Sequence, residues 1–411
     1  EDTAYIRIDS LNNVTRSFWE QYSIIGPESR IYEYYTVPGL LGIYHFNRVE
    51  GHTFSLDFRM NGMLDRRLRA GFDFAYGLSD KKAKQKFTAE YAAGTYREIR
   101  IGLSARNEIE YLLPEAAYKS PFQTTMVSLL SRFDSDDYFY RRGAELNVSA
   151  DIFRYITFSA GYGYQDDRSA VNRTAYAIFG KGKQYRQNMQ IADVSYHSLS
   201  AGIGLDLRDY IEDGYYRRRL GRSSDFPLID IYADFMTGGT YNRTSFGYGT
   251  KIRGTLPVSL STELRYRLHG FYANGPLPFQ RLQAAAGNMD WSARENTFRT
   301  LGIYPAAGER GYTAFLNYDT GDALFRASGI PFLNTAELQL GLFVNSGLFV
   351  QNAETKLFNR SNFLPEFTRP FYEAGFSLGH AIVPLTFEFA WKLNYRGDKN
   401  FRISIVSLSN F

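Results

Sequence analysis

The chain has 411 residues and no cysteine, which excludes disulfides, thiolate metal sites and cysteine nucleophiles. Lysine and arginine number 47 against 43 aspartates and glutamates, and the net charge of +4 is too balanced for a nucleic-acid-binding polycation. No apolar run approaches the roughly 18 residues of a transmembrane helix. Glycine (36), tyrosine (32) and phenylalanine (33) are abundant, although hydrophobic residues make up only 44% of the chain. This composition is typical of a transmembrane β-barrel, and the spacing of the apolar residues tests that interpretation.

The chain opens with two stretches whose apolar residues have helical spacing. Residues 17–22 and 27–35 are each apolar on one side, and Pro27 stands where a helix can begin. We therefore expect a short N-terminal helical segment. Residues 1–38 are predicted to form a periplasmic or plug segment, and residues 39–411 an outer-membrane β-barrel.

From about residue 39 onward, apolar and polar residues alternate. For example, Phe54, Leu56 and Phe58 alternate with Ser55 and Asp57. Alternation requires only a sheet with one apolar face, so a large soluble β-sandwich or propeller is the alternative. However, the apolar faces continue for about nine or ten residues, which is the length of a tilted strand that crosses a bilayer. Since backbone groups in lipid must be paired, we predict an all-β fold, a closed transmembrane antiparallel β-barrel.

The predicted strands are separated alternately by short and long connections, as in bacterial barrels. Their ranges are 40–48, 52–60, 67–78, 86–94, 95–106, 142–151, 155–165, 193–207, 227–237, 244–256, 259–272, 297–319, 335–345, 372–380, 384–394 and 400–408. The long connections 107–141, 166–192, 273–296 and 346–371 all fall on one side. This arrangement gives about 16 strands with both ends in the periplasm, and about 14 or 18 remain open. Two stretches are irregular: 208–226 is long but periplasmic, and 297–319 is one interrupted strand or two.

Short motifs spread over the chain resemble those of one protein family. They are 46–51 (Phe-Asn-Arg-Val-Glu-Gly), 18–19 (Phe-Trp), 26–28 (Gly-Pro-Glu), 31–32 (Ile-Tyr), 277–279 (Leu-Pro-Phe), Leu282, 287–288 (Gly-Asn), 311–317, and 330–333 (Ile-Pro-Phe-Leu). Together they resemble a family of uncharacterised Gram-negative outer-membrane barrels, which often carry an N-terminal carboxypeptidase-regulatory-like domain. The resemblance implies a location in the bacterial cell outer membrane.

That family is in turn distantly similar to the superfamily of outer-membrane assembly factors and two-partner-secretion barrels. Residues 372–378, 384–393 and 401–408 resemble the last three strands of that superfamily, and 273–296 stands where its lumen-inserted sixth loop lies. The superfamily's loop normally carries an Arg-Gly-Tyr/Phe motif, whereas 286–291 here reads Ala-Gly-Asn-Met-Asp-Trp. Fold kinship is therefore expected more firmly than shared function.

Charged residues on the polar face of the predicted strands should face the lumen, because each would cost about 2–4 kcal/mol against lipid. The lumen candidates are Asp57, Arg59, Arg100, Lys251, Arg253, Glu263, Arg265, Arg267, Glu337, Glu373, Glu388, Lys392 and Arg402. They form either a network that fills the interior together with inserted loops, or a water-filled pathway whose charges select solutes. Near-equal numbers of acids and bases favour the network.

Two motifs are further candidates for functional positions. The barrel-entry motif consists of Asn47, Arg48, Glu50 and Gly51, in which Arg48 and Glu50 act as a structural clamp or as a functional switch. The inserted-loop motif is the pair Gly287 and Asn288.

The sequence gives little support for catalysis. The five histidines are scattered, and neither a metal-ligand spacing nor a nucleophile motif is present. We expect no enzymatic activity, no catalytic or metal site and no cofactor. The expected partners are outer-membrane lipid and lipopolysaccharide, with other outer-membrane or periplasmic proteins as candidates, and no nucleic acid.

Three functions stay open. The first is a component of an outer-membrane assembly, translocation or other multi-protein complex, which predicts a weak seam between strands 40–48 and 400–408. The second is a porin-like passive or selective diffusion channel, which predicts an open lumen. The third is a structural or surface scaffold with a plugged lumen.

Overall fold

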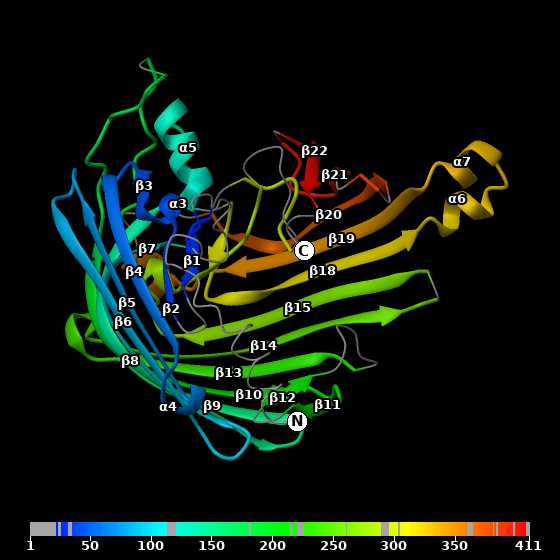
Figure 1. Ribbon diagram of the computed structural model, residues 1–411. Coiled ribbons are helices and arrows are strands. Elements are labelled where there is room, and N and C mark those ends of the chain that lie inside the picture. Colours follow the sequence, from blue (N-terminus) through cyan, green and yellow to red (C-terminus); the bar gives the residue numbers. More distant parts are fainter. Residues whose placement is uncertain are drawn as a thin grey trace.

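The computed structural model describes residues 22–23, 26–31, 35–112, 121–180, 182–213, 216–219, 226–259, 261–288, 296–302, 305–359, 365–380, 382–383, 385–397 and 399–407. Its main feature is an 18-stranded antiparallel sheet. Figure 1 shows this sheet curling from the blue strands on the left, through the green strands below, to the orange and red strands at the top. The predicted all-β barrel architecture is confirmed.

The long strands of the sheet pair with their neighbours in chain order, beginning at β4. Their bounds are β4 Gly51–Gly62, β5 Leu68–Gly77, β6 Lys82–Ala93, β7 Ile99–Tyr111, β8 Tyr138–Phe153, β9 Ile156–Ser169, β10 Val194–Leu205, β13 Leu228–Thr237, β14 Thr244–Pro257, β15 Glu263–Asn274, β18 Arg310–Gly321, β19 Leu338–Val350, β20 Phe367–His380, β21 Leu385–Lys392 and β22 Phe401–Ser407. Every predicted strand range overlaps an observed strand. The ambiguous range 297–319 contains one long strand, which begins only at Arg310.

The first edge of the sheet is assembled from short pieces. They are β1 (Glu28–Ile31), β2 (Tyr35–Pro38), α3 (Leu40–Ile43) and β3 (Tyr44–Asn47). β3 pairs with the start of β4, and β2 pairs near its end, with α3 between them. At the other edge, β22 pairs with β21 and with no further strand in the described part of the chain.

The N-terminal helix expected at residues 27–35 is wrong. This stretch contains β1, which forms a hairpin-like pair with β2 in the register Glu28 opposite Pro38. The free edge of β4 supplies backbone partners for β2, and this pairing outweighs a helical spacing too short to form a stable helix. Apart from Tyr22, the other expected helix, at 17–22, lies outside the described residues.

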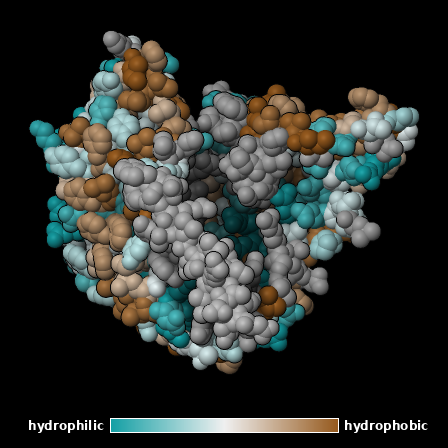
Figure 2. Space-filling model, viewed as in Figure 1, coloured by the Kyte–Doolittle hydropathy of each residue, from teal (hydrophilic) through white to brown (hydrophobic). Residues whose placement is uncertain are grey.

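Alternation along each strand separates an outer apolar face from an inner polar one. On β4 the outward Phe54 and Leu56 are 50% and 62% exposed, whereas the inward Thr53 is fully buried. Figure 2 shows apolar surface over the outer strands on the left of the view and hydrophilic atoms in the central recess. Side chains such as Leu56 can be exposed because this face meets lipid. No helix in the described part of the chain is long and apolar enough to cross a bilayer.

Connections at the two ends of the barrel differ in length, as predicted. One end carries the long loops, with α5 (Pro121–Ser131), η3 (Phe279–Arg281), β16 (Gln283–Ala284), β17 (Ala307–Gly308), α8 (Ala353–Phe358) and the short η2 (Gly239–Tyr241). The other end carries α4 (Met63–Arg66), the hairpin of β11 (Tyr210–Asp213) and β12 (Tyr216–Arg219), and the pair α6 (Ala323–Ala327) and α7 (Pro331–Thr335), which projects beyond β18 and β19 in Figure 1. The irregular connection 208–226 is thus a true exception that contains its own hairpin.

Candidate functional site: a loop held inside the barrel

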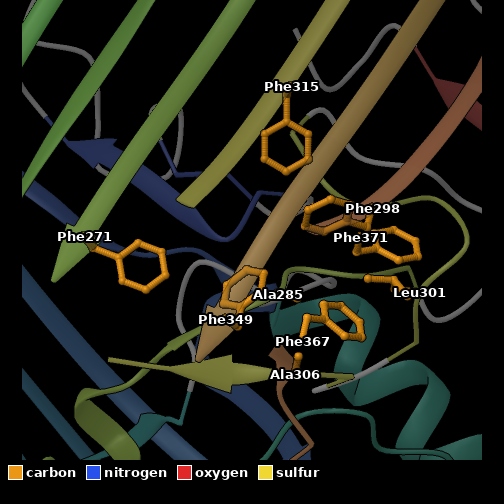
Figure 3. Packing of buried hydrophobic residues seen from close by; sticks show 9 residues of the cluster. All are labelled: Phe271, Ala285, Phe298, Leu301, Ala306, Phe315, Phe349, Phe367 and Phe371. Carbon is orange, nitrogen blue, oxygen red and sulfur yellow. The ribbon is translucent and has the colours of Figure 1, made fainter. Parts of the chain in front are cut away.

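The connection between β15 and β18 is called the lumen loop below. Its described residues, 275–288, 296–302 and 305–309, pack against the inner face of the sheet. Its Phe298 is fully buried between Phe315 of β18 and Phe371 of β20, with ring centroids 5.0 and 5.5 Å away. Figure 3 shows Phe298 and Phe371 next to each other, with Leu301 beside them. Ala285, Leu301 and Ala306 of the loop complete this cluster with Phe271, Phe349 and Phe367. Burial of several aromatic rings inside a barrel fixes the loop by the hydrophobic effect.

Glu373 of β20 receives the backbone of the lumen loop. Its carboxylate oxygens accept hydrogen bonds from the backbone N–H groups of Arg299 and Thr300 at 2.7 and 2.9 Å. The Thr300 hydroxyl and the Asn345 amide of β19 also donate to it, at 2.6 and 2.8 Å. Since this side chain is fully buried, four donors replace the water that a carboxylate would otherwise require.

Arg299 forms a two-pronged ion pair with Glu388 of β21. The guanidinium Nε lies 2.5 Å from one carboxylate oxygen and Nη2 lies 3.0 Å from the other. The two side chains are 5% and 10% exposed. This geometry fixes both the position and the orientation of the loop, because both prongs of the guanidinium fork are occupied.

The inserted-loop motif lies in the same region. The Asn288 carbonyl accepts a hydrogen bond from Arg402 of β22 at 2.5 Å, and its N–H donates to the Leu301 carbonyl at 2.7 Å. Gly287 pairs with Phe298, and a Cβ atom at Gly287 would lie 2.2 Å from the Gly302 carbonyl oxygen. Only glycine fits this close approach of two backbone segments.

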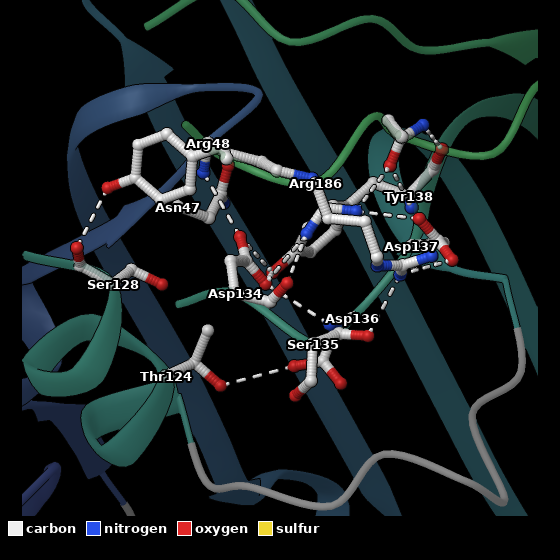
Figure 4. Close-up of polar contacts among 12 residues, drawn as sticks. Asn47, Arg48, Thr124, Ser128, Asp134, Ser135, Asp136, Asp137, Tyr138 and Arg186 are labelled. Atoms are coloured by element: carbon white, nitrogen blue, oxygen red, sulfur yellow. Dashed lines mark hydrogen bonds and ion pairs between the residues drawn. The ribbon is translucent and has the colours of Figure 1, made fainter. Parts of the chain in front are cut away.

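The barrel-entry motif forms a second buried cluster, centred on Arg48 in the turn between β3 and β4. Its guanidinium lies 3.1 Å from an Asp134 carboxylate oxygen and 2.6 Å from Asp137, and it donates to the Asn172 side chain at 3.2 Å. Figure 4 shows Arg48 pointing toward Asp134, and Arg186 bound to Asp137. The turn thereby connects Asp134 and Asp137, which precede β8, with Asn172, which follows β9.

Glu50 anchors the same turn from the lumen side. Its carboxylate lies 2.7 Å from the Lys84 ammonium and accepts a hydrogen bond from Asn47 at 2.5 Å. Burial alone would raise the pKa of Glu50, but the hydrogen bonds and charges of His45 and Lys84 outweigh it and lower the pKa to about 2. Gly51 follows with a φ of 68°, a left-handed conformation that favours glycine.

The remaining lumen candidates lie in smaller groups on the strands. Arg59 lies 3.3 Å from Asp73, Arg253 3.9 Å from Asp230, and Arg265 3.3 and 3.5 Å from Glu263 and Asp319. Lys392 stands opposite Glu373 in the register of β20 and β21, and Asp57 stands opposite Asp73. Arg100 and Arg267 are exposed on β7 and β15. Glu337 lies in the turn before β19 rather than within a strand, with a φ of 48° and an exposed side chain.

Sequence reasoning missed Arg299, Asp134 and Asp137. The resemblance to the family's Gly-Asn loop indicated Gly287 and Asn288, whereas the arginine that binds the barrel wall stands later, within the sequence Phe-Arg-Thr at 298–300. An isolated arginine next to an aromatic residue in a long loop was the available signal.

The curled antiparallel sheet, its apolar exterior and its loop-filled interior define an outer-membrane β-barrel. The chain belongs to a family of unknown function, DUF5686, because residues 22–355 match the C-terminal domain of that family. The predicted resemblance to an uncharacterised outer-membrane barrel family is therefore confirmed. No curated protein matches the sequence.

Solved structures of outer-membrane proteins have a similar fold. BamA from Haemophilus ducreyi lacking POTRA domains 1–3 is similar with a TM-score of 0.50 at 15% identity, over 88% of this chain and 68% of that one. CdiB from Acinetobacter baumannii has a TM-score of 0.45 at 11% identity, over 88% of this chain and 57% of that one. Similarity at this level of identity concerns the fold alone.

Proposed function

We propose that this barrel is a non-enzymatic component of an outer-membrane assembly or translocation complex, and that polypeptide substrates engage it at the edge formed by β22. The observation that carries the proposal is that the strands at the two edges of the sheet differ in length. β22 has 7 residues, whereas the opposite edge consists of the 4-residue strands β2 and β3 with α3 between them. Edges of this kind present unpaired N–H and C=O groups, to which another strand can add.

The lumen loop supports this function over a wide passive pore. The contacts of the loop with Glu373, Glu388 and Arg402 keep it against the wall of the lumen. A loop held inside the lumen obstructs a straight aqueous path. We therefore expect a polypeptide substrate to engage the lateral edge of the barrel rather than to pass through its lumen. The water-facing charges on β14 and β15 favour a selective channel as the second candidate, and conductance separates the two.

Site-specific photo-cross-linking in cells tests the proposal. A photoreactive residue is placed at Ile403 of β22 or, as the matched control, at Leu199 in the middle of the sheet. Both side chains face outward, with exposed fractions of 49% and 52%, so lipid contact is equivalent at the two positions. We expect polypeptide adducts at Ile403 and none at Leu199.

Several outcomes would argue against the proposal. Equal adducts at both positions would mean that polypeptides have no preference for the β22 edge, and no adducts at Ile403 would mean that this edge engages no polypeptide. Steady, ion-selective conductance of the refolded barrel in a planar bilayer would instead favour the channel. A folded barrel with neither adducts nor conductance would favour the plugged scaffold.

A further inference from the structure

A cavity of about 350 Å³ lies between the lumen loop and the inner face of β13, β14, β15 and β18. Its strand wall carries Lys251, Arg253 and Arg267, and its loop wall carries Gln283 and Thr297. Phe271, Phe315 and Phe349 border the cavity with the apolar cluster that holds the loop. The cavity therefore combines a basic, hydrogen-bonding wall with an aromatic border.

Among the described residues, carboxylates do not match the two arginines of this wall one to one. Arg253 and Arg267 stand directly opposite each other in the register of β14 and β15. Asp230 is the one carboxylate that lines the cavity among the described residues; it stands opposite Lys251 and lies 3.9 Å from Arg253. In the described part of the chain, Arg267 has no ion pair.

The neighbouring arginine on the same strand shows what a balanced site looks like. Arg265 lies 3.3 Å from Glu263 and 3.5 Å from Asp319. Among the residues described, Arg267 has no such partners. The lack of carboxylates is therefore confined to the cavity and does not extend along β15. Two like charges that stand opposite each other across a strand pair are destabilising. An anion bound between the two arginines would reduce this repulsion.

We propose that this cavity binds a small organic anion, with a phosphate or carboxylate group between Arg253, Arg267 and Lys251 and a flat apolar part against the phenylalanine rings. Guanidinium groups present two parallel donors that match the oxygens of a phosphate or carboxylate. The Gln283 amide lies on the facing wall, where it can donate to polar atoms of the bound molecule. This site is separate from the β22 edge and goes beyond the proposed function.

Phenyl phosphate is the probe that combines both features. Its affinity for the detergent-refolded barrel is measured by calorimetry, with heat-modifiable gel mobility as the control for folding. We expect Arg267→Gln to weaken binding at least about tenfold, because it removes a charge-assisted contact. The matched control is Arg100→Gln, an exposed arginine on β7 without an ion pair among the described residues, which should leave the affinity within about twofold.

Further probes identify which part of the molecule is recognised. Inorganic phosphate should bind more weakly than phenyl phosphate, benzoate should compete through its carboxylate, and benzyl alcohol should not bind. Binding should weaken with added salt, and Lys251→Gln should reduce it in the same direction as Arg267→Gln. Absence of binding of both phenyl phosphate and benzoate at millimolar concentration would overturn the proposal. An equal loss in Arg100→Gln would also overturn it, since it would mean a general electrostatic effect of the lumen.

Discussion

Replacing Arg299 by methionine tests how the lumen loop is held. In the folded barrel its guanidinium lies 2.5 and 3.0 Å from the two Glu388 carboxylate oxygens. Both side chains are largely inaccessible to water, at 5% and 10% exposure. Methionine would leave the Glu388 charge buried without its partner, and removal of one member of such a pair costs about 3–5 kcal/mol. Arg253→Met is the matched control, since Arg253 lies 3.9 Å from Asp230 with about half of its side chain exposed.

The free energy of unfolding can be measured in urea, with the protein refolded into lipid vesicles and followed by tryptophan fluorescence. Trp391 lies on the same strand as Glu388 and reports on that part of the barrel. We expect Arg299→Met to lower the free energy of unfolding by about 3–5 kcal/mol and Arg253→Met to lower it by less than about 1 kcal/mol.

A double-mutant cycle with Glu388→Gln then isolates the pair, for which a coupling energy of about 0.5–3 kcal/mol is expected. If Arg299→Met cost no more than Arg253→Met, water in the lumen would be stabilising the lone carboxylate. The Arg299–Glu388 pair would then not be what positions the loop.

Three predictions concern the turn between β3 and β4. Arg48→Met should lower the free energy of unfolding by about 3–5 kcal/mol and speed trypsin cleavage after Arg132, since Asp134 and Asp137 lose a buried partner; an unchanged cleavage rate would contradict this. The pKa of Glu50 is lowered from 4.5 to about 2, so its stabilisation is fully present above about pH 4.5 and is lost as the pH falls toward 2. Glu50→Gln should remove this part of the pH dependence in urea unfolding, and identical curves for the two proteins would refute the assignment. Gly51→Ala should cost about 1–3 kcal/mol, because φ is 68° and the added Cβ would lie 2.0 Å from the Ser79 hydroxyl. In a thermal gel-shift assay Gly182→Ala, which has nothing within 4 Å of its added Cβ, serves as control; equal shifts would argue against strain.

The strands could be predicted from the sequence because their signal is local. Alternation such as Phe54, Leu56 and Phe58 is a property of neighbouring residues and needs no knowledge of the partner strand. The same local reasoning failed at 27–35, where the edge of β4 decides the conformation. There, pairing with β4 provides backbone hydrogen bonds to β2, whereas a helix of this length is not stable by itself.

The candidate site could be predicted only in part. Glu373 and Glu388 were expected inside the lumen because lipid would not accept them. Their partners could not be predicted, since Arg299 is 89 residues away from Glu388 and Arg48 is 86 residues away from Asp134. Contacts over such separations depend on how the barrel curls, which a single sequence does not encode locally.

The position of the lumen loop in the chain has a consequence for the order of assembly. Its three anchors lie on β20, β21 and β22, which follow the loop by 74, 89 and 114 residues in the contacts that they make. The loop therefore cannot reach its final position until the last strands of the barrel have formed. Until then Arg299 lacks its carboxylate partner Glu388 and Phe298 lacks Phe371, so we expect the loop to settle together with the C-terminal strands.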